Sequence, residues 1–149
     1  MQTITQEHGF PGIITTSHAP SRGELVAGRA MSGTAVAFLV FDSLGKLLEV
    51  QPVLDGTRQL GYPPEIVFVL GVTLLSCVLT HLVPRTSVLG AVLLTAYLGG
   101  AVATHVRVGS PLFSHVLFPA YLAALLWGGL LLRDAQLRAF LPLRDRRRS

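Results

Sequence analysis

Four long stretches of apolar and small residues follow one another along the chain, and short polar segments separate them. The most regular stretch begins at Ser87 and continues for about 18 uncharged residues. As a helix it would span about 27 Å, close to the hydrocarbon thickness of a bilayer. The same pattern predicts helices over roughly residues 24–50, 64–83, 86–106 and 112–133. We therefore predict an all-α fold, a membrane four-helix bundle formed by residues 24–133.

The first stretch is the least regular of the four. Its uninterrupted apolar run, residues 30–41, is too short to span a bilayer, so this helix must also include Asp42 and Lys46. Side chains four residues apart share one face of a helix, which predicts an ion pair. Two interpretations stay open. Either the pair faces the interior of the bundle or a water-filled cavity, or both side chains lie at the interface and extend to water.

Turn-forming residues predict how the four helices are connected. Residues 51–64 contain several prolines and glycines, which predict a loop or a short surface helix. Residues 84–87 form a tight connection, so the second and third helices should be an antiparallel hairpin. Pro119 should kink the fourth helix, because proline lacks the backbone N–H group. Outside the bundle we predict a disordered polar tail at residues 1–23 and a basic cytoplasmic tail at residues 134–149.

Composition is typical of a membrane protein. Half of the residues are hydrophobic, only 13% are charged and the mean hydropathy is +0.56. A soluble domain has about 25% charged residues. The net charge of +4 is concentrated at the C-terminus, where four of the last six residues are arginines. We expect these arginines to lie beside a lipid bilayer, and we expect no nucleic-acid partner.

Positive charge is distributed unevenly between the two sides of the predicted bundle. Four crossings place both termini on one side, and that side holds nine arginines. The other side holds three cationic residues, Lys46, Arg58 and Arg107. Cytoplasmic segments of membrane proteins carry the excess of lysine and arginine. We therefore predict that both termini are cytoplasmic.

Polar residues from all four predicted helices share one depth on the outer side. This outer-side polar cluster consists of Asp42, Lys46, Glu65, His105, Arg107 and His115. Tyr97 and Thr104 share one face of the third helix and lead inward from the cluster. Such a cluster is a candidate site for an anion, a polar headgroup, a quinone ring or a proton relay. The alternative is a set of interfacial charges that neutralise one another and seal the outer end.

Motifs for catalysis and for metal binding are absent from the sequence. No triad or phosphate loop accompanies the cluster, and its two histidines are too few for a metal site. The single cysteine, Cys77, excludes both an intrachain disulfide and a Cys-x-x-Cys redox pair. We therefore predict no catalytic residue and no metal.

Small residues form a stripe in the third helix, at Ala96, Gly99, Gly100 and Ala103. Small residues let neighbouring helices approach closely in a membrane, where no hydrophobic force acts between helices. We predict that this stripe is a helix-packing surface. The sequence leaves open whether the protein forms a homo-oligomer.

One part of the chain carries a family resemblance. The sequence LVPRT at residues 82–86 precedes LGAVLLTAYLGGAVATH at residues 89–105, and LGYP at residues 60–63 supports them. Through these motifs the chain resembles the DoxX-like family of small bacterial integral membrane proteins over roughly residues 29–144. The resemblance implies a four-helix bundle and a multi-pass location in the bacterial inner (plasma) membrane. It transfers no catalytic residue to this chain.

Three functional hypotheses follow. The first is an accessory or non-enzymatic role in a redox or stress pathway, with no cofactor. The second is the membrane subunit of a quinone-linked oxidoreductase, with a quinone and a membrane redox partner subunit. It follows because the resemblance extends to a distant relative, the membrane subunit of a thiosulfate:quinone oxidoreductase. The third is a small proton-coupled transporter, because four helices with a membrane acid, here Asp42, could move protons.

Overall fold

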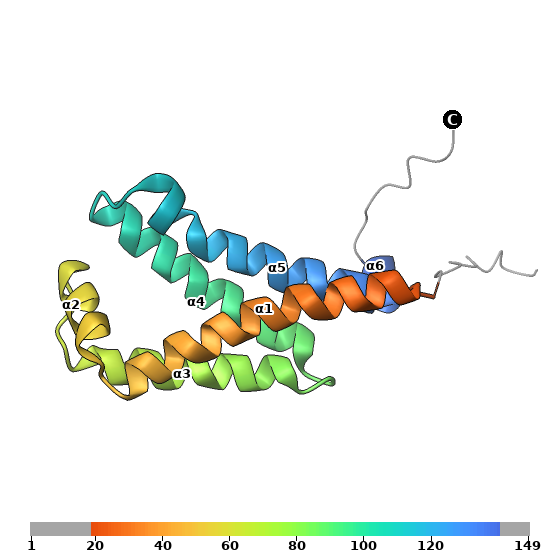
Figure 1. Cartoon of the computed structure of the whole chain (residues 1–149), viewed down its shortest axis with the longest axis horizontal. Helices are drawn as coiled ribbons and strands as arrows, with labels where there is room; N and C mark the ends of the chain where they lie inside the picture. The colour runs from red at the N-terminus through yellow and green to blue at the C-terminus, as the bar shows by residue number, and fades with distance from the viewer. Residues whose placement is uncertain (1–18, 141–149) are drawn as a thin grey trace, which may run out of the picture.

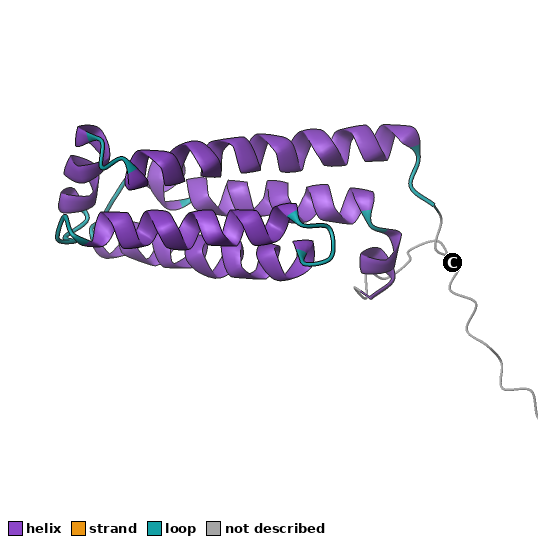
Figure 2. Ribbon diagram, turned by 90° about the horizontal axis from the view of Figure 1, so that it is seen from below, coloured by secondary structure: helices purple, strands orange, loops and turns teal. Residues whose placement is uncertain are grey.

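The computed structural model describes residues 19–140, and this part of the chain is helical without strands. The all-α prediction is therefore confirmed (Figure 2). The elements in chain order are α1 (Arg22–Leu47), α2 (Gln51–Gln59), α3 (Ile66–Leu82), α4 (Ser87–Arg107), the π-helix η1 (Leu112–Val116), α5 (Phe118–Arg133) and α6 (Ala135–Phe140). Three segments are long and apolar enough to cross a membrane: α1, α4, and η1 together with α5. Helix α3 is apolar but shorter, with 17 residues.

Capping residues explain where the first helix begins. The Ser21 hydroxyl accepts a hydrogen bond from the Glu24 N–H at 3.2 Å, and the Glu24 carboxylate accepts one from the Ser21 N–H at 2.7 Å. This reciprocal pair satisfies N–H groups that lack partners at a helix start. As a result α1 begins at Arg22, inside the segment predicted as tail, and ends at Leu47. Helix α1 is thus shifted toward the N-terminus relative to the predicted range 24–50.

Two segments outside the predicted membrane helices are also helical. Residues 51–59 form α2, with Pro52 in its first turn, where the missing N–H group costs nothing. Residues 135–140, predicted as tail, form α6, and the Asp134 carboxylate accepts hydrogen bonds from the first N–H groups of that helix. The other residues of the two predicted tails, 1–18 and 141–149, lie outside the described part of the chain.

The four long helices pack around one core. Helix α1 contacts α5 and α3, α3 contacts α4, and α4 contacts α5 (Figure 1). Each of these helices contributes one fully buried leucine, namely Leu39, Leu74, Leu94 and Leu126. The start of α1 and the end of α5 lie together at one end of the molecule, which we call the termini end. The opposite end, formed by α2, η1 and the adjoining ends of α1 and α4, is called the distal end.

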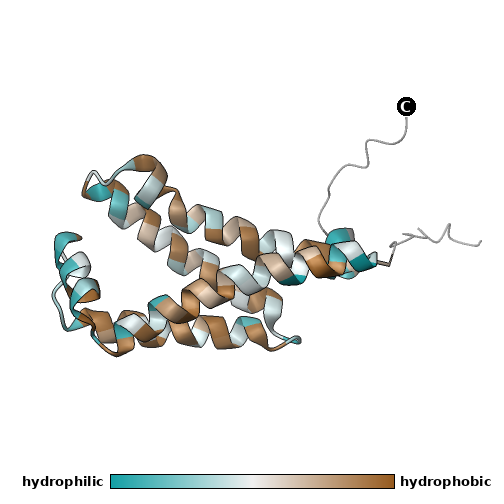
Figure 3. Cartoon of the chain, viewed as in Figure 1, coloured by the Kyte–Doolittle hydropathy of each residue, from teal (hydrophilic) through white to brown (hydrophobic). Residues whose placement is uncertain are grey.

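The outward faces of the helices are apolar as well as the core. Phe41 and Phe113 are 76% and 75% exposed, and many leucines and valines are about half exposed. Figure 3 shows hydrophobic residues along the long helices on the face turned to the viewer. A helix that is apolar on all faces is typical of a lipid environment or a protein core, not of contact with water. The surface therefore agrees with the three membrane-spanning candidates.

Glycines set the close helix contacts at the termini end. A Cβ atom on Gly28 of α1 would lie 2.9 Å from the carbonyl oxygen of Gly129 on α5, and one on Gly129 would lie 2.7 Å from the carbonyl oxygen of Gly28. A Cβ atom on Gly90 of α4 would collide with the backbone of His81 on α3. Backbones thus touch directly in two helix pairs, which small residues permit.

Candidate functional site

A cavity of about 690 Å³ lies at the distal end, between α1 and α2 on one side and α4, η1 and α5 on the other. Its apolar walls include Leu39, Leu98, Phe118 and Leu122. Its polar lining residues are Asp42, Lys46, Thr57, Gln59, Tyr62, Tyr97, Thr104, His105, Ser110 and His115. The cavity therefore combines an apolar interior with polar groups drawn from several helices.

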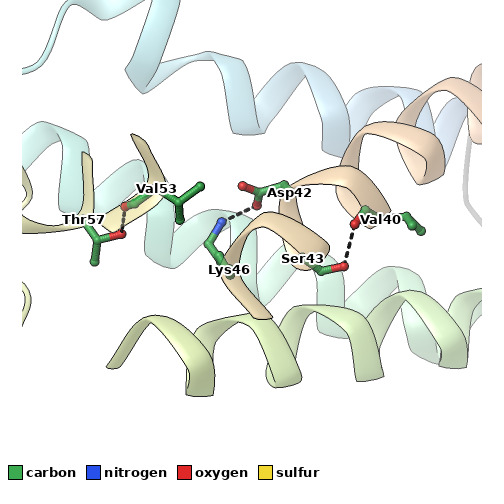
Figure 4. Close-up of polar contacts among 6 residues, drawn as sticks. All are labelled: Val40, Asp42, Ser43, Lys46, Val53 and Thr57. Atoms are coloured by element: carbon green, nitrogen blue, oxygen red, sulfur yellow. Dashed lines mark hydrogen bonds and ion pairs between the residues drawn. The ribbon is translucent and has the colours of Figure 1, made fainter. Parts of the chain in front are cut away.

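The acid and the lysine of α1 form the predicted ion pair. Lys46 Nζ lies 2.5 Å from Asp42 Oδ2, and the two side chains are 14% and 31% exposed respectively. Figure 4 shows Lys46 reaching along α1 to Asp42, with Val53 and Thr57 of α2 beyond it. Both charged residues line the cavity. Of the two arrangements considered from the sequence, the pair adopts the one that faces a cavity.

Two tyrosines bring phenol groups to the cavity. The Tyr62 hydroxyl lies 3.0 Å from Thr104 Oγ1, and Thr104 in turn donates to the carbonyl of Gly100 at 2.9 Å. A hydroxyl has one hydrogen to donate, so Tyr62 must be the donor to Thr104. This bond joins the α2–α3 turn to α4. Tyr97 is half-buried on the cavity wall, and its hydroxyl makes no hydrogen bond within the described part of the chain.

Two histidines lie on the α4 and η1 side of the cavity. The rings of His105 and His115 are 5.6 Å apart, edge to face. His105 Nδ1 contacts the Ser110 hydroxyl at 3.0 Å, and His115 Nδ1 contacts the Ser114 hydroxyl at 2.8 Å. Neither Nε2 atom has a hydrogen bond to the described residues, so both are available to a ligand.

A break in the predicted fourth helix positions His115. Instead of one kinked helix over residues 112–133, the chain forms the π-helix η1 and then α5 from Phe118. The Leu117 N–H reaches back to the Leu112 carbonyl at 2.9 Å, which is the wider π spacing. Pro119 accounts for the break, because a proline ring would collide with the carbonyl four residues earlier in a continuous α-helix.

The structure brings four of the six predicted cluster residues together, because Asp42, Lys46, His105 and His115 all line the cavity. Glu65 is exposed at the start of α3, away from the cavity lining. Arg107 is exposed and donates to the Leu60 carbonyl at 2.7 Å, so it attaches the end of α4 to the turn after α2. Residues at the same depth need not face the same direction, which explains why Glu65 and Arg107 do not line the cavity with the other four.

Helix α2 supplies cavity residues that the sequence prediction missed. Val53, Gly56, Thr57 and Leu60 all line the cavity. Their spacing of three, four and seven residues places them on one face of a helix. This spacing was the available signal, but it is recognisable only once residues 51–59 are taken as a helix.

The small-residue stripe of α4 faces outward. Ala96, Gly99, Gly100 and Ala103 are all exposed, and a Cβ atom on Gly99 or Gly100 would meet nothing within 4 Å. The stripe therefore makes no close helix contact within the described part of the chain. Its predicted packing role remains a prediction for a contact with another molecule. Close contacts inside the chain use other glycines instead, namely Gly28, Gly71, Gly90 and Gly129.

Metal-binding groups do not gather in the described part of the chain, which has no set of three His, Cys, Asp or Glu side chains that could hold an ion. Cys77 is buried in the core between helices and does not line the cavity. The ionisable groups at the cavity are thus one ion pair, two imidazoles and two phenols.

Comparison with known proteins identifies the family. The profile of the DoxX-like family matches residues 30–129, which is about two-thirds of the chain. The chain therefore belongs to the DoxX-like family, and the resemblance seen in the sequence is confirmed. Together with the apolar helices, this membership makes it a membrane protein. No curated protein and no solved structure matches the chain.

Proposed function

We propose that this DoxX-like protein is a multi-pass protein of the bacterial inner membrane that binds a small amphipathic molecule with a polar ring, such as a quinone, in its distal cavity. In the proposed topology α1, α3, α4 and η1–α5 cross the membrane as a four-helix bundle, and both termini are cytoplasmic. The start of α1 and the end of α5 lie at the same end of the molecule, as an even number of membrane crossings requires. The excess of arginines at that end supports the orientation.

The cavity is the observation that supports a binding role. Its volume of about 690 Å³ falls within the range of about 300–1,000 Å³ that is typical of small-molecule sites. A seal made of mutually neutralised charges would need no such space. The lining is apolar with a few polar groups, which is the usual composition of a site for an amphipathic ligand.

The polar groups favour a ligand with carbonyl or hydroxyl oxygens. The Tyr97 hydroxyl lacks a hydrogen-bond partner in the described residues, and the Nε2 atoms of His105 and His115 are also open. A neutral imidazole donates or accepts according to its tautomer, and a phenol does both. These groups can therefore pair with a quinone carbonyl or with the hydroxyl of the reduced ring. Leu98 and Leu122 would contact the apolar part of such a ligand.

An accessory role without turnover is the primary form of this proposal, because the cavity groups bind but do not form a nucleophile and base in contact. The second candidate, the membrane subunit of a quinone-linked oxidoreductase, would use the same cavity together with a redox partner subunit. The Tyr97 hydroxyl and the two imidazoles support this second candidate, because they can hydrogen-bond to a quinone ring. A proton-coupled transporter is less favoured, because Lys46 already holds the membrane acid Asp42.

Binding of a short-chain ubiquinone or menaquinone to the purified full-length protein tests the proposal. Ala101 lines the cavity, so Ala101→Trp should fill it and weaken binding at least about tenfold, whereas Ala96→Trp, on the exposed face of the same helix, should bind as the native chain does. Isothermal titration calorimetry in detergent gives both affinities. Absence of quinone binding to the native protein, or equal binding by the two variants, would refute a site in this cavity.

The two candidate roles separate in a second measurement. Purification from native membranes with a mild detergent would retain a redox partner subunit, and the complex would reduce quinone when given an electron donor. Quinone binding without a partner and without reduction supports the accessory role. Reduction that is lost in Tyr97→Phe supports the oxidoreductase subunit.

A further inference from the structure

A second, smaller pocket of about 180 Å³ lies at the termini end between α1, α3 and α5. Its cationic lining residues are Arg29 of α1 and Arg133 of α5. The rest of the wall is formed by α1 and by the end of α3, through Ser32, Gly33, Val36, His81 and Leu82. We call it the arginine pocket. It is separate from the distal cavity and shares no lining residue with it.

Hydrogen bonds hold the Arg133 guanidinium in place. Its Nε donates to the Gly129 carbonyl at 3.1 Å, and its Nη2 donates to the buried Ser32 hydroxyl at 3.2 Å. The close contact of α5 with Gly28 places the Arg133 stem directly on α1, since a Cβ atom there would lie 2.8 Å from Arg133 Cγ. Five N–H groups belong to each guanidinium, so several donors stay available after these two bonds. The Arg133 guanidinium therefore has a fixed orientation and further N–H groups that can donate to a ligand.

Acidic side chains do not neutralise the pocket within the described part of the chain. The three ion pairs among the described residues join Lys46 to Asp42, Arg58 to Asp55 and Arg138 to Glu24. None of them includes Arg29 or Arg133. The acids nearest in the fold are engaged elsewhere, because Glu24 pairs with Arg138 and Asp134 caps α6. Two arginines without an acid at a partly apolar position favour an anion as the missing partner.

The arrangement of polar and apolar groups along α1 indicates what kind of anion fits. Arg29 lies nearest the helix start, and Gly33 and Val36 follow one and two turns deeper. Leu82, which is 54% exposed, borders the same pocket. A cationic mouth above an apolar wall matches a lipid, with its phosphate at the arginines and the start of an acyl chain along the deeper residues. Free phosphate would use only the mouth.

We propose that the arginine pocket binds the phosphodiester headgroup of an anionic phospholipid. Arg29 and Arg133 contact the phosphate oxygens, and Gly33 leaves the space that the headgroup occupies. In the orientation proposed above, this lipid belongs to the cytoplasmic leaflet. The site does not depend on the ligand of the distal cavity, so the two proposals fail independently.

Native mass spectrometry of the full-length protein, released from nanodiscs of phosphatidylglycerol and phosphatidylcholine in equal amounts, tests the site. The native protein should retain one phosphatidylglycerol in preference to phosphatidylcholine. Arg29→Gln should lower that occupancy about fivefold, the effect of one cation near an anionic lipid. Arg85→Gln is the matched control, because Arg85 is exposed in the α3–α4 turn at the same end but does not line the pocket.

A second variant blocks the pocket without removing charge. A Cβ atom on Gly33 would meet nothing within 4 Å, so Gly33→Leu should fold normally and place its side chain in the headgroup space. It should reduce phosphatidylglycerol retention while both arginines remain. Gly33→Leu is preferred to Arg133→Gln as the second variant, because Arg133→Gln would also lose the hydrogen bond to Ser32 and disturb folding.

Three outcomes would overturn the proposal. In the first, Arg29→Gln and Gly33→Leu retain the lipid as the native protein does. In the second, Arg85→Gln loses as much lipid as Arg29→Gln, which would mean that surface charge alone attracts the lipid. In the third, inorganic phosphate at millimolar concentration displaces the bound lipid completely, which would identify a site for free phosphate.

Discussion

The two ends of the helix assembly differ in how closely the helices meet. At the termini end, Gly28 meets Gly129 and Gly90 meets His81, so helix backbones lie in direct contact. At the distal end, α2 and the π-helix η1 widen the assembly, and a cavity of about 690 Å³ lies between the helix pairs. Backbone contacts far from the cavity thus hold the helices together, and the helices separate at the cavity. The distal end can remain open because the termini end is closed.

The difference also appears in what crosses between helices. At the termini end two helix pairs meet backbone to backbone. At the distal end long-range hydrogen bonds join the turn after α2 to α4, and one further close approach brings Gly71 of α3 to the Leu47 backbone of α1. Tyr62 bonds to Thr104 across 42 residues, and Arg107 bonds to Leu60 across 47. Polar contacts of this kind contribute about 0.5–1.5 kcal/mol each. The comparison predicts that the closed end dominates stability and that the open end determines quinone binding.

Enlarging a glycine at the closed end should have the largest effect. Gly90→Leu would drive a side chain into the His81 backbone, and we expect the free energy of unfolding to fall by at least about 3 kcal/mol. Gly100→Leu is the matched control on the same helix, because its side chain would meet open space. It should leave stability unchanged or raise it by up to about 0.8 kcal/mol. Unfolding in a detergent titration, followed by circular dichroism, measures both, and equal losses would contradict the assignment of the closed end.

We expect the Asp42–Lys46 pair at the open end to make the fold no more stable than two leucines would. Asp42→Leu leaves the Lys46 charge partly buried without its partner, so the free energy of unfolding should fall by about 1–3 kcal/mol. Replacing both residues by leucine should restore it or exceed the native value. Quinone affinity should fall in both variants. A double variant that is no more stable than Asp42→Leu would show that the pair itself stabilises the fold.

Loss of the polar tie across the cavity should have the smallest effect. Tyr62→Phe removes the hydrogen bond to Thr104, at a cost of about 1 kcal/mol, and frees the α2 wall. Amide hydrogen exchange in α2 should accelerate while exchange in α3 near Leu74 stays slow. Tyr121→Phe on the exposed face of α5 is the control and should change neither rate. Equal acceleration throughout the chain would place Tyr62 in the common core instead.

The long helices were predictable because their signal is local. Each is a mostly apolar run, interrupted in α1 by charged residues such as Asp42 and Lys46, and such a run is recognised without knowledge of the rest of the chain. Boundaries were less accurate where a side chain decides them, as Ser21 does for α1. The direction in which each polar residue points was not predictable from depth alone, because it depends on helix rotation. Glu65 and Arg107 share the predicted depth of Asp42 but face away from the cavity.

Glycines show the same limit from another side. Gly90 and Gly100 belong to one apolar run, and the sequence drew attention to the second because other small residues surround it. In the structure Gly90 makes the close contact and Gly100 is exposed. Which glycine is needed depends on the partner helix, here the end of α3, and this long-range contact leaves no mark in the local pattern.

The unequal lengths of α1 and α3 have a consequence for the surrounding bilayer. With 26 and 17 residues, these helices measure about 39 Å and 26 Å, on either side of a hydrocarbon thickness of about 30 Å. In the proposed topology the charged ends of α1, at Arg22 and Lys46, extend into the headgroup regions along its oblique path in Figure 1, while the lipid tails beside α3 must shorten. Hydrophobic mismatch thereby makes acyl-chain length a variable that acts mainly on the α3 side of this protein.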